Sequence, residues 1–195
     1  EEWKRKTISQ MNGDTEKFEQ EHCCSFIGSS GTLIAGWKLK ELTHATPMHV
    51  KQGLYTYETP IKGHQYVATI DVSRGKGLDY SAIQVIDVTS MPYKQVCAFR
   101  SNITTPRDFA QIAFTVLKNY NDAITLVEIN DIGAQLADML YDDYEFENIL
   151  FTESAGPQGK RITAGFGRNV DKGVRTTRTV KNVGCSIIKL LVEQN

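Results

Sequence analysis

The chain has 195 residues, of which 41% are hydrophobic and 23% charged, and its formal net charge is −1. This composition is typical of a globular protein with one core, and it excludes collagen, coiled coil and long disordered chains. Because the net charge is close to zero, binding to nucleic acid would need a local basic surface. No apolar run approaches the roughly 20 residues of a membrane-spanning helix, so we expect no membrane partner.

The cysteines and the first residues indicate the cellular compartment of the protein. Cys23, Cys24, Cys97 and Cys185 have neither the spacing of a metal site nor the density of a disulfide scaffold, which favours reduced thiols in a cytosolic protein. The chain begins at Glu1 without an initiator methionine or a signal segment, so we expect a non-secreted piece of a longer protein.

Residues 1–64 have a mixed pattern, and we predict that they form a linker or extension before the main domain. Their caps, turns and apolar runs predict a helix over 14–22, a strand over 32–35, one or two helical turns over 37–42 and a strand over 54–57.

Residues 65–152 are far more regular. Apolar runs separated by short loops predict three antiparallel strands, over 66–72, 81–88 and 95–100. Helices and strands then alternate, with a helix from Thr105 to about residue 120, a strand over 124–129, a helix over 132–140 and a strand over 148–152. The order β-β-β-α-β-α-β predicts an α/β fold.

The first of these helices has a clear start. Thr105 is a suitable N-cap and Pro106 a suitable first helical residue. A further helix is predicted beyond Thr179, where apolar residues recur at helical spacing.

Two acids lie within apolar strands. Asp71 ends the first strand and Glu128 is inside the fourth, and burying two like charges without a counterion is costly. A shared hard cation, Mg²⁺ or Mn²⁺, would remove that cost; the alternative is that each acid pairs with a nearby Arg or Lys. Asp79 follows the glycine turn and is placed to approach Asp71, whereas Asp131 is predicted to cap the next helix.

Gly75 and Gly77 form a turn after the first strand. A strand that ends in Asp before such a turn can also hold phosphates, as in actin-like ATPases, so an actin-like nucleotide-binding fragment is an alternative. The P-loop pattern is absent from the sequence, which excludes a P-loop motor.

The stretch 158–181 carries seven basic residues and one acid. Such a stretch suits the phosphodiester backbone of DNA, and the alternative is a solvated, flexible loop. We predict that it contacts DNA and lies on the same side of the domain as Asp71. Its basic residues are Lys160, Arg161, Arg168, Lys172, Arg175, Arg178 and Lys181.

Segments 68–80, 127–130 and 181–185 resemble the C-terminal nuclease domain of the large terminase subunit of T-even-type tailed phages, and 18–21 and 26–29 resemble the segment that precedes it. The resemblance implies a ribonuclease H-like mixed sheet flanked by helices, with a linker over 1–64 and the nuclease domain over 65–195, truncated at its C-terminal end.

The resemblance also implies a function. Asp71 and Glu128 match the metal-binding acids of that family, and Asp79 matches the acid after the glycine turn. The family has a third carboxylate on a later helix, which neither Asp171 nor Glu193 matches, so the fragment itself is expected to be inactive if that ligand is absent. The implied reaction is Mg²⁺- or Mn²⁺-assisted hydrolysis of phosphodiesters.

The resemblance further implies the biological setting. The substrate is double-stranded DNA, cut at the start and end of genome packaging, and the parent motor contacts the portal or prohead and the small terminase subunit. The location is the host cytoplasm and not the mature virion. A non-catalytic DNA-binding module is the other alternative, because the basic stretch alone would serve it.

Overall fold

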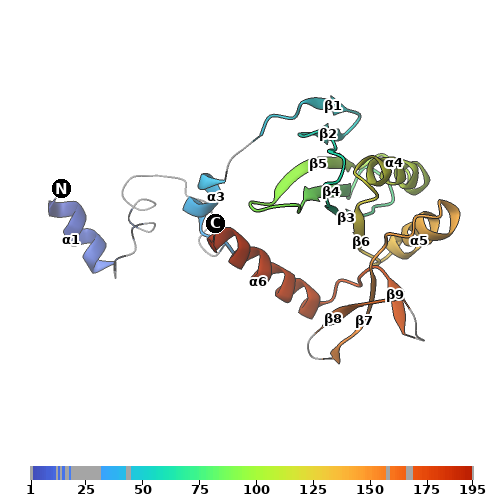
Figure 1. The fold of residues 1–195 in the computed structure, drawn as a ribbon. Helices are drawn as coiled ribbons and strands as arrows, with labels where there is room; N and C mark the ends of the chain where they lie inside the picture. The colour runs from blue at the N-terminus through green and yellow to red at the C-terminus, as the bar shows by residue number, and fades with distance from the viewer. Residues whose placement is uncertain are drawn as a thin grey trace. The chain divides into compact units, whose positions relative to one another are not determined.

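The computed structural model describes residues 2–11, 13, 15, 18, 32–42, 45–156, 159–165 and 169–194. The chain divides into two compact units, one of residues 45–184 and one of residues 1–44 with 185–195. The first unit contains both β-sheets and the helices packed on them (Figure 1).

The main sheet has six strands in the order β1-β2-β5-β4-β3-β6. Only β3 and β6 are parallel; every other neighbouring pair is antiparallel. The predicted ribonuclease H-like α/β fold is therefore confirmed, and β1 and β2, which precede the predicted domain start at residue 65, belong to the same sheet. The strands are β1 (His49–Lys51), β2 (Leu54–Thr56), β3 (Tyr66–Asp71), β4 (Ser81–Asp87), β5 (Lys94–Ser101) and β6 (Ile124–Val127).

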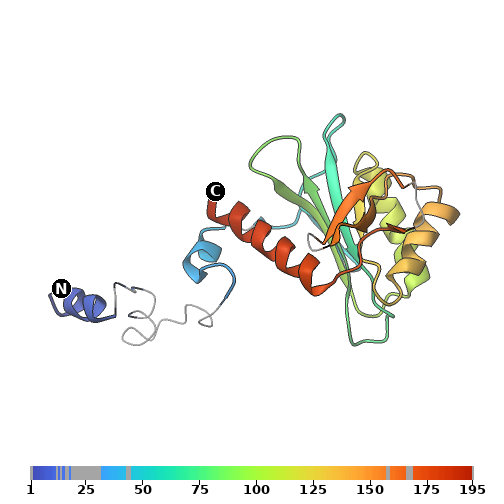
Figure 2. The ribbon, with the colours of Figure 1, turned by 90° about the horizontal axis from the view of Figure 1, so that it is seen from below.

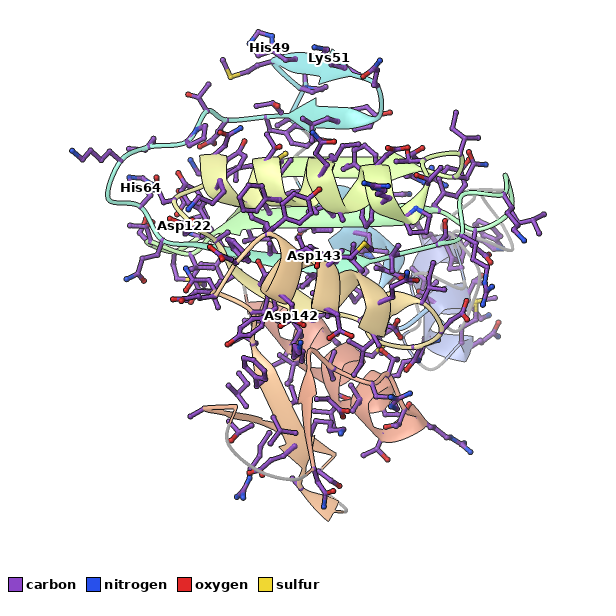
Figure 3. All side chains as sticks on the ribbon, turned by 90° about the vertical axis from the view of Figure 1, so that its right-hand side faces the viewer. His49, Lys51, His64, Asp122, Asp142 and Asp143 are labelled. Atoms are coloured by element: carbon purple, nitrogen blue, oxygen red, sulfur yellow. The ribbon has the colours of Figure 1, made fainter. Side chains whose placement is uncertain are left out.

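Three helical segments cover one face of this sheet: α4 (Pro106–Asn119), α5 (Gly133–Asp138) and the π-helix η1 (Met139–Asp143). Figures 1 and 2 show α4 and α5 on the same side of the sheet, and Figure 3 looks onto them with Asp142 and Asp143 labelled on η1. The start of α4 is as predicted, since the Thr105 side chain accepts a hydrogen bond from the backbone N–H of Asp108.

The alternation of side chains along β3 decides which residues face these helices. Tyr66, Ala68 and Ile70 are buried in the core, whereas Thr69 and Asp71 are exposed on the other face. Successive residues of a strand point to opposite faces, so Asp71 lies on the face opposite α4.

A second sheet, of three strands in the order β8-β7-β9, follows η1. Its strands are β7 (Phe151–Ser154), β8 (Lys160–Thr163) and β9 (Val170–Lys172). The predicted strand over 148–152 is therefore shifted, and only one isolated bridge, between Thr125 and Ile149, links this region to β6. The reason is that the basic stretch supplies both antiparallel partners of β7, which sequence periodicity does not reveal.

The remaining helices are α1 (Glu2–Gln10), α3 (Gly36–Glu41) and α6 (Arg178–Gln194). α3 and α6 match the predictions, whereas α1 was not predicted. The strand predicted over 32–35 is wrong: the Thr32 hydroxyl donates to the backbone oxygen of Ile34, and Ala35 precedes the first residue of α3. Most of the helix predicted over 14–22 lies outside the described residues.

Two further sequence predictions concern the cysteines and membrane-spanning helices. Cys97 and Cys185 are free thiols, while Cys23 and Cys24 lie outside the described residues. Across the described parts of the chain, no helix combines the length and the apolarity needed to cross a bilayer.

Candidate functional site

Asp71 and Glu128 come together because their strands are parallel neighbours. In the pairing of β3 with β6, Ile70 lies opposite Val127, and the backbone N–H of Glu128 donates to the backbone oxygen of Ile70 at 2.8 Å. Ile70 and Val127 are both buried, so the next residue on each strand points to the opposite face. The two carboxylates are therefore neighbours on the same face of the sheet.

The electrostatics of Asp71 fit this placement. Partial burial raises the pKa of the Asp71 carboxyl, and the neighbouring charge of Glu128 raises it further. A hydrogen bond from the backbone of Val72 acts in the opposite direction, and the charge of Asp79 adds a smaller increase to this pKa. A cation bound between the two neighbouring carboxylates would offset the repulsion between their charges.

The Glu128 side chain is held in place by the residues that follow it. Its Oε2 accepts a hydrogen bond from the backbone N–H of Asn130 at 3.1 Å, and the Asn130 side chain donates to the backbone oxygen of Thr176 at 3.0 Å. Gly133 packs so closely that an added Cβ would lie 1.9 Å from the Glu128 backbone oxygen. Glu128 is therefore fixed both by the turn after β6 and by the chain that leads into α6.

That returning chain runs directly beside Glu128. Val174 forms a parallel bridge with Glu128, its N–H donates to the oxygen of Val127 at 2.8 Å, and its own oxygen accepts from Ile129 at 3.0 Å. Gly173, with φ +110°, is required here, because an added Cβ would lie 2.3 Å from the backbone oxygen of Val127.

The two acids line a hollow of about 450 Å³ at this edge of the sheet. Asp79, the third sequence-predicted residue, lines the same hollow, but no group of three His, Cys, Asp or Glu side chains close enough to hold a metal occurs among the described residues. The lining residues are Asp71, Val72, Ser73, Arg74, Lys76, Leu78, Asp79, Tyr80, Glu128, Asn130 and Asp131.

Asp131 does not cap α5, contrary to the prediction. The N-cap position belongs to Ile132, without a side-chain hydrogen bond, and Asp131 instead forms a two-point ion pair with Arg74. The distances are 3.0 Å from Arg74 Nε to Oδ2 and 2.5 Å from a terminal nitrogen to Oδ1. Hydrogen bonding to Arg74 lowers the pKa of the Asp131 carboxyl. The preference of Asp for N-cap positions suggested the cap, but Asp131 instead pairs with Arg74, which lies 57 positions away in the sequence.

The glycine turn is attached to the loop after β5. The N–H of Gly77 donates to the Asn102 backbone oxygen at 2.8 Å, and the Asn102 side chain donates back to the Gly77 oxygen at 3.0 Å. The N–H of Gly75 donates to the Ser73 hydroxyl at 3.4 Å. Since these N–H groups already have partners within the protein, the turn offers little to a nucleotide phosphate, which disfavours the actin-like alternative.

Three of the seven basic residues predicted to contact DNA have carboxylate partners. Lys160 pairs with Asp171 at 2.7 Å, Arg161 with Glu153 at 2.6 Å, and Lys172 with both Asp138 and Asp142 at 2.8 and 2.6 Å. The stretch forms strands β8 and β9, which both pair with β7 and not with each other, and its formal positive charge is partly neutralised.

The other basic residues predicted to contact DNA differ in their ion-pair partners. No described carboxylate lies within ion-pair distance of Arg175, Arg178 or Lys181, and all three side chains are exposed. Arg175 directly follows Val174, the residue bridged to Glu128. Arg168 lies outside the described residues.

Sequence reasoning missed Arg74, Asn130 and Asp131 as parts of this site. One signal was available: Arg74 is the third residue after Asp71, and Asp131 is the third residue after Glu128. Because the two strands are parallel and in register, equal offsets bring the residues that follow them to the same edge.

Comparison with known proteins agrees with this fold. A family profile described as "Terminase RNaseH-like domain" matches residues 68–194. Two crystal structures of the large terminase nuclease from the thermophilic phage G20c, with bound magnesium and with bound cobalt, are 17% and 18% identical to the chain, and each superposes with a TM-score of 0.61 over 86% of this chain and 72% of that one. The zinc-bound structure of the same nuclease is 17% identical, with a TM-score of 0.55 over 77% and 71%. Likeness at these identities establishes a shared fold.

Proposed function

Because the chain belongs to the family of terminase RNase H-like domains, we propose that it is the DNA-cleaving part of a phage large terminase, which cuts concatemeric DNA when genome packaging starts and ends. One observation carries the proposal: Asp71 and Glu128 are neighbours on one face of the sheet, where partial burial and then the charge of Glu128 raise the pKa of Asp71. A purely structural pair of acids would be expected to have basic partners, and neither acid has an ion pair with a described residue.

The donor set fits a hard divalent cation. Carboxylate oxygens are the ligands that Mg²⁺ and Mn²⁺ prefer, and Mg²⁺ usually keeps several waters when only one or two carboxylates bind it. Asp71 and Glu128 would hold the metal, which supplies Lewis-acid stabilisation of the phosphodiester and a more acidic bound water. The G20c structures with magnesium, cobalt and zinc support divalent-metal use by this fold, and we propose Mg²⁺ or Mn²⁺ here.

The other residues of the site would act on DNA or on the two acids. Asn130 fixes the carboxylate of Glu128, and Asp79 adds negative charge at the rim of the hollow. Arg175, Arg178 and Lys181, which lack described carboxylate partners, would neutralise backbone phosphates beside the acids. Lys160, Arg161 and Lys172 would contribute less, because each already has an ion-pair partner.

The wider setting is part of the same proposal. The substrate is double-stranded DNA, the chain works in the host cytoplasm beside an ATP-driven motor, and that motor contacts the portal and the small terminase subunit. A non-catalytic DNA-binding module is the second candidate, because no third acid lies close enough to hold a metal together with Asp71 and Glu128 among the described residues.

Plasmid cleavage separates the two candidates. Supercoiled plasmid is incubated with the chain and Mg²⁺ or Mn²⁺, and conversion to nicked and linear forms is compared for wild type, Asp71→Asn and Glu128→Gln. We expect metal-dependent cleavage that both variants abolish, while Asp108→Asn, at the start of α4, cleaves as wild type does. Plasmid binding without cleavage by the wild-type chain would favour the binding module.

A further inference from the structure

The two most exposed large apolar side chains among the described residues are Leu78, 82% exposed, and Ile103, 76% exposed. Leu78 is in the glycine turn (residues 75–79) after β3, and Ile103 is in the Asn102 loop (residues 102–104) after β5. Single exposed apolar residues are ordinary on protein surfaces. These two, however, each directly follow one member of a hydrogen-bonded pair, Gly77 with Asn102.

Two contacts join the glycine turn to the Asn102 loop. Gly77 and Asn102 exchange hydrogen bonds of 2.8 and 3.0 Å, as described above. At Gly75, with φ +67°, the backbones approach so closely that an added Cβ would lie 2.4 Å from the Thr104 oxygen. The loops therefore form one unit, in which Leu78 and Ile103 each lie one residue from the contact between Gly77 and Asn102.

Hydrogen bonds and a cation–π contact also stiffen this unit. The Ser101 hydroxyl oxygen accepts hydrogen bonds from the N–H of Ile103 at 3.4 Å, the N–H of Thr104 at 3.2 Å and the Thr104 hydroxyl at 2.7 Å. At the end of the glycine turn, the guanidinium of Arg100 stacks 3.8 Å from the centre of the Tyr80 ring. The two apolar tips thus project from a stiff frame, which lowers the ordering cost of inserting them into a ligand.

The position and charge of the unit indicate its partner. Leu78 lines the same hollow as Asp71 and Glu128, together with Lys76 of the same turn and with Arg74, which precedes the turn and pairs with Asp131. A stable protein interface needs about 1,000 Å² of buried surface, far more than two side-chain tips provide. Apolar tips next to basic residues instead match the way proteins insert side chains between base steps of DNA.

We propose that Leu78 and Ile103 form an apolar wedge that enters a groove of duplex DNA and partly unstacks one base step beside the acid hollow. The proposal rests on the proposed function for the identity of its ligand. The wedge covers the exposed base faces, while Lys76 lies beside the flanking phosphates. The distortion brings one strand of the duplex toward Asp71 and Glu128.

The test compares binding to two duplexes that differ only by one central mismatch, measured by fluorescence anisotropy in EDTA so that no cleavage occurs. A mismatched step costs less to unstack, so we expect the wild-type chain to prefer the mismatched duplex by roughly five- to tenfold. The double variant Leu78→Ser, Ile103→Ser is expected to lose the preference, to below about twofold, while the salt dependence of binding stays unchanged.

Two further variants separate the wedge from a general apolar effect. Ile162→Ser removes another highly exposed apolar side chain, 66% exposed on β8, and is expected to keep the preference. Asn102→Ala leaves both tips intact but removes the side-chain hydrogen bond from Asn102 to the Gly77 oxygen, while the backbone bond between the two residues remains, and is expected to weaken the preference.

Each contrary result has a distinct meaning. Equal binding of both duplexes by the wild-type chain overturns the wedge and leaves the proposed function standing. Binding of neither duplex contradicts both proposals. If the double variant keeps the mismatch preference but alters the sedimentation of the chain, the tips are a protein contact and the wedge is wrong.

Discussion

Arg74 and Asp131 connect the two loops that follow the acid-bearing strands, through hydrogen bonds of 3.0 and 2.5 Å. Each is the third residue after its acid, so the ion pair spans the mouth of the hollow that Asp71 and Glu128 line. Both side chains are exposed, at 56% and 61%. Water screens such a pair and it adds little to stability, so we expect its main effect to be on the binding of DNA.

We predict that Arg74→Gln and Asp131→Asn change DNA affinity in opposite directions. Arg74→Gln removes a cation from the mouth of the hollow and should weaken binding to all duplexes alike. Asp131→Asn removes an anion and releases Arg74 toward phosphate, so it should tighten binding. Anisotropy titrations at low salt measure both effects. Equal weakening by the two variants would mean that the pair only shapes the loops, and thermal melts should show both variants as stable as wild type.

The second prediction concerns the stability of the metal-free protein. The pKa of Asp71 is raised in the folded state, so ionisation of this group above that pKa disfavours folding. Asp71→Asn should therefore raise the melting temperature at pH 7 in EDTA, by on the order of 2 °C. Adding Mg²⁺ should raise the melting temperature of the wild-type chain and not that of the variant. A lower melting temperature for Asp71→Asn in EDTA would contradict this account of the two acids.

The third prediction separates the paired from the unpaired basic residues. Arg175→Gln with Arg178→Gln removes two charges without described ion-pair partners, and should flatten the slope of log affinity against log salt by about 2. Lys160→Gln with Arg161→Gln removes two charges that already have partners, and should change the slope by less than about 1. Duplex binding across a salt series measures both. A larger change in the Lys160 and Arg161 variant would place the DNA on the second sheet.

The fourth prediction is a pH dependence of folding remote from the site. Asp87 contacts His64 at 2.7 Å and accepts a hydrogen bond from the backbone of Thr89 at 2.9 Å. Burial of Asp87 acts to raise its pKa, but the hydrogen bonds from Thr89 and then His64 outweigh it and lower the pKa to about 2. An Asp whose folded pKa is lowered stabilises the protein above its unfolded pKa of about 3.9 and loses that contribution as the pH falls through about 2.

Asp87→Asn should therefore lower the free energy of unfolding at pH 7 by about 1 kcal/mol and flatten its decline between pH 4 and pH 2. Urea denaturation at several pH values measures the slope. Asp122→Asn, which breaks the exposed pair of Lys118 with Asp122, is the control and should keep the wild-type slope. A wild-type slope in Asp87→Asn would show that the contacts with Thr89 and His64 do not lower the pKa of Asp87 in solution.

Much of the fold could be predicted because its signals are local. The apolar runs of β3 to β6 and the capped start of α4 lie in consecutive residues, and the structure has them within a few positions of the prediction. Asp71 and Glu128 stood out for the same reason, as acids within apolar strands. The prediction failed for β7 because its partners, β8 and β9, lie in a glycine-rich stretch with little periodicity.

The missed parts of the site depend on contacts between distant segments. Asp131 looked like a helix cap from its neighbours alone, and only the arrangement of β3 beside β6 brings Arg74 to it. The ion pairs of Lys160, Arg161 and Lys172 similarly follow from the second sheet and from its packing on α5 and η1. A count of basic residues along the sequence cannot distinguish charges that the fold neutralises from those that stay available.

The bridge between Val174 and Glu128 has a consequence for how this region tolerates change in length. The chain leaves the neighbourhood of β6 after Leu150, forms the second sheet, and returns at Gly173, whose N–H donates to the Leu150 oxygen at 2.9 Å. The two ends of this segment are thus hydrogen-bonded to each other, and the residues between them form a loop that is closed at its base. Residues added to or removed from the segment between β8 and β9 should therefore change the length of this loop without shifting Glu128.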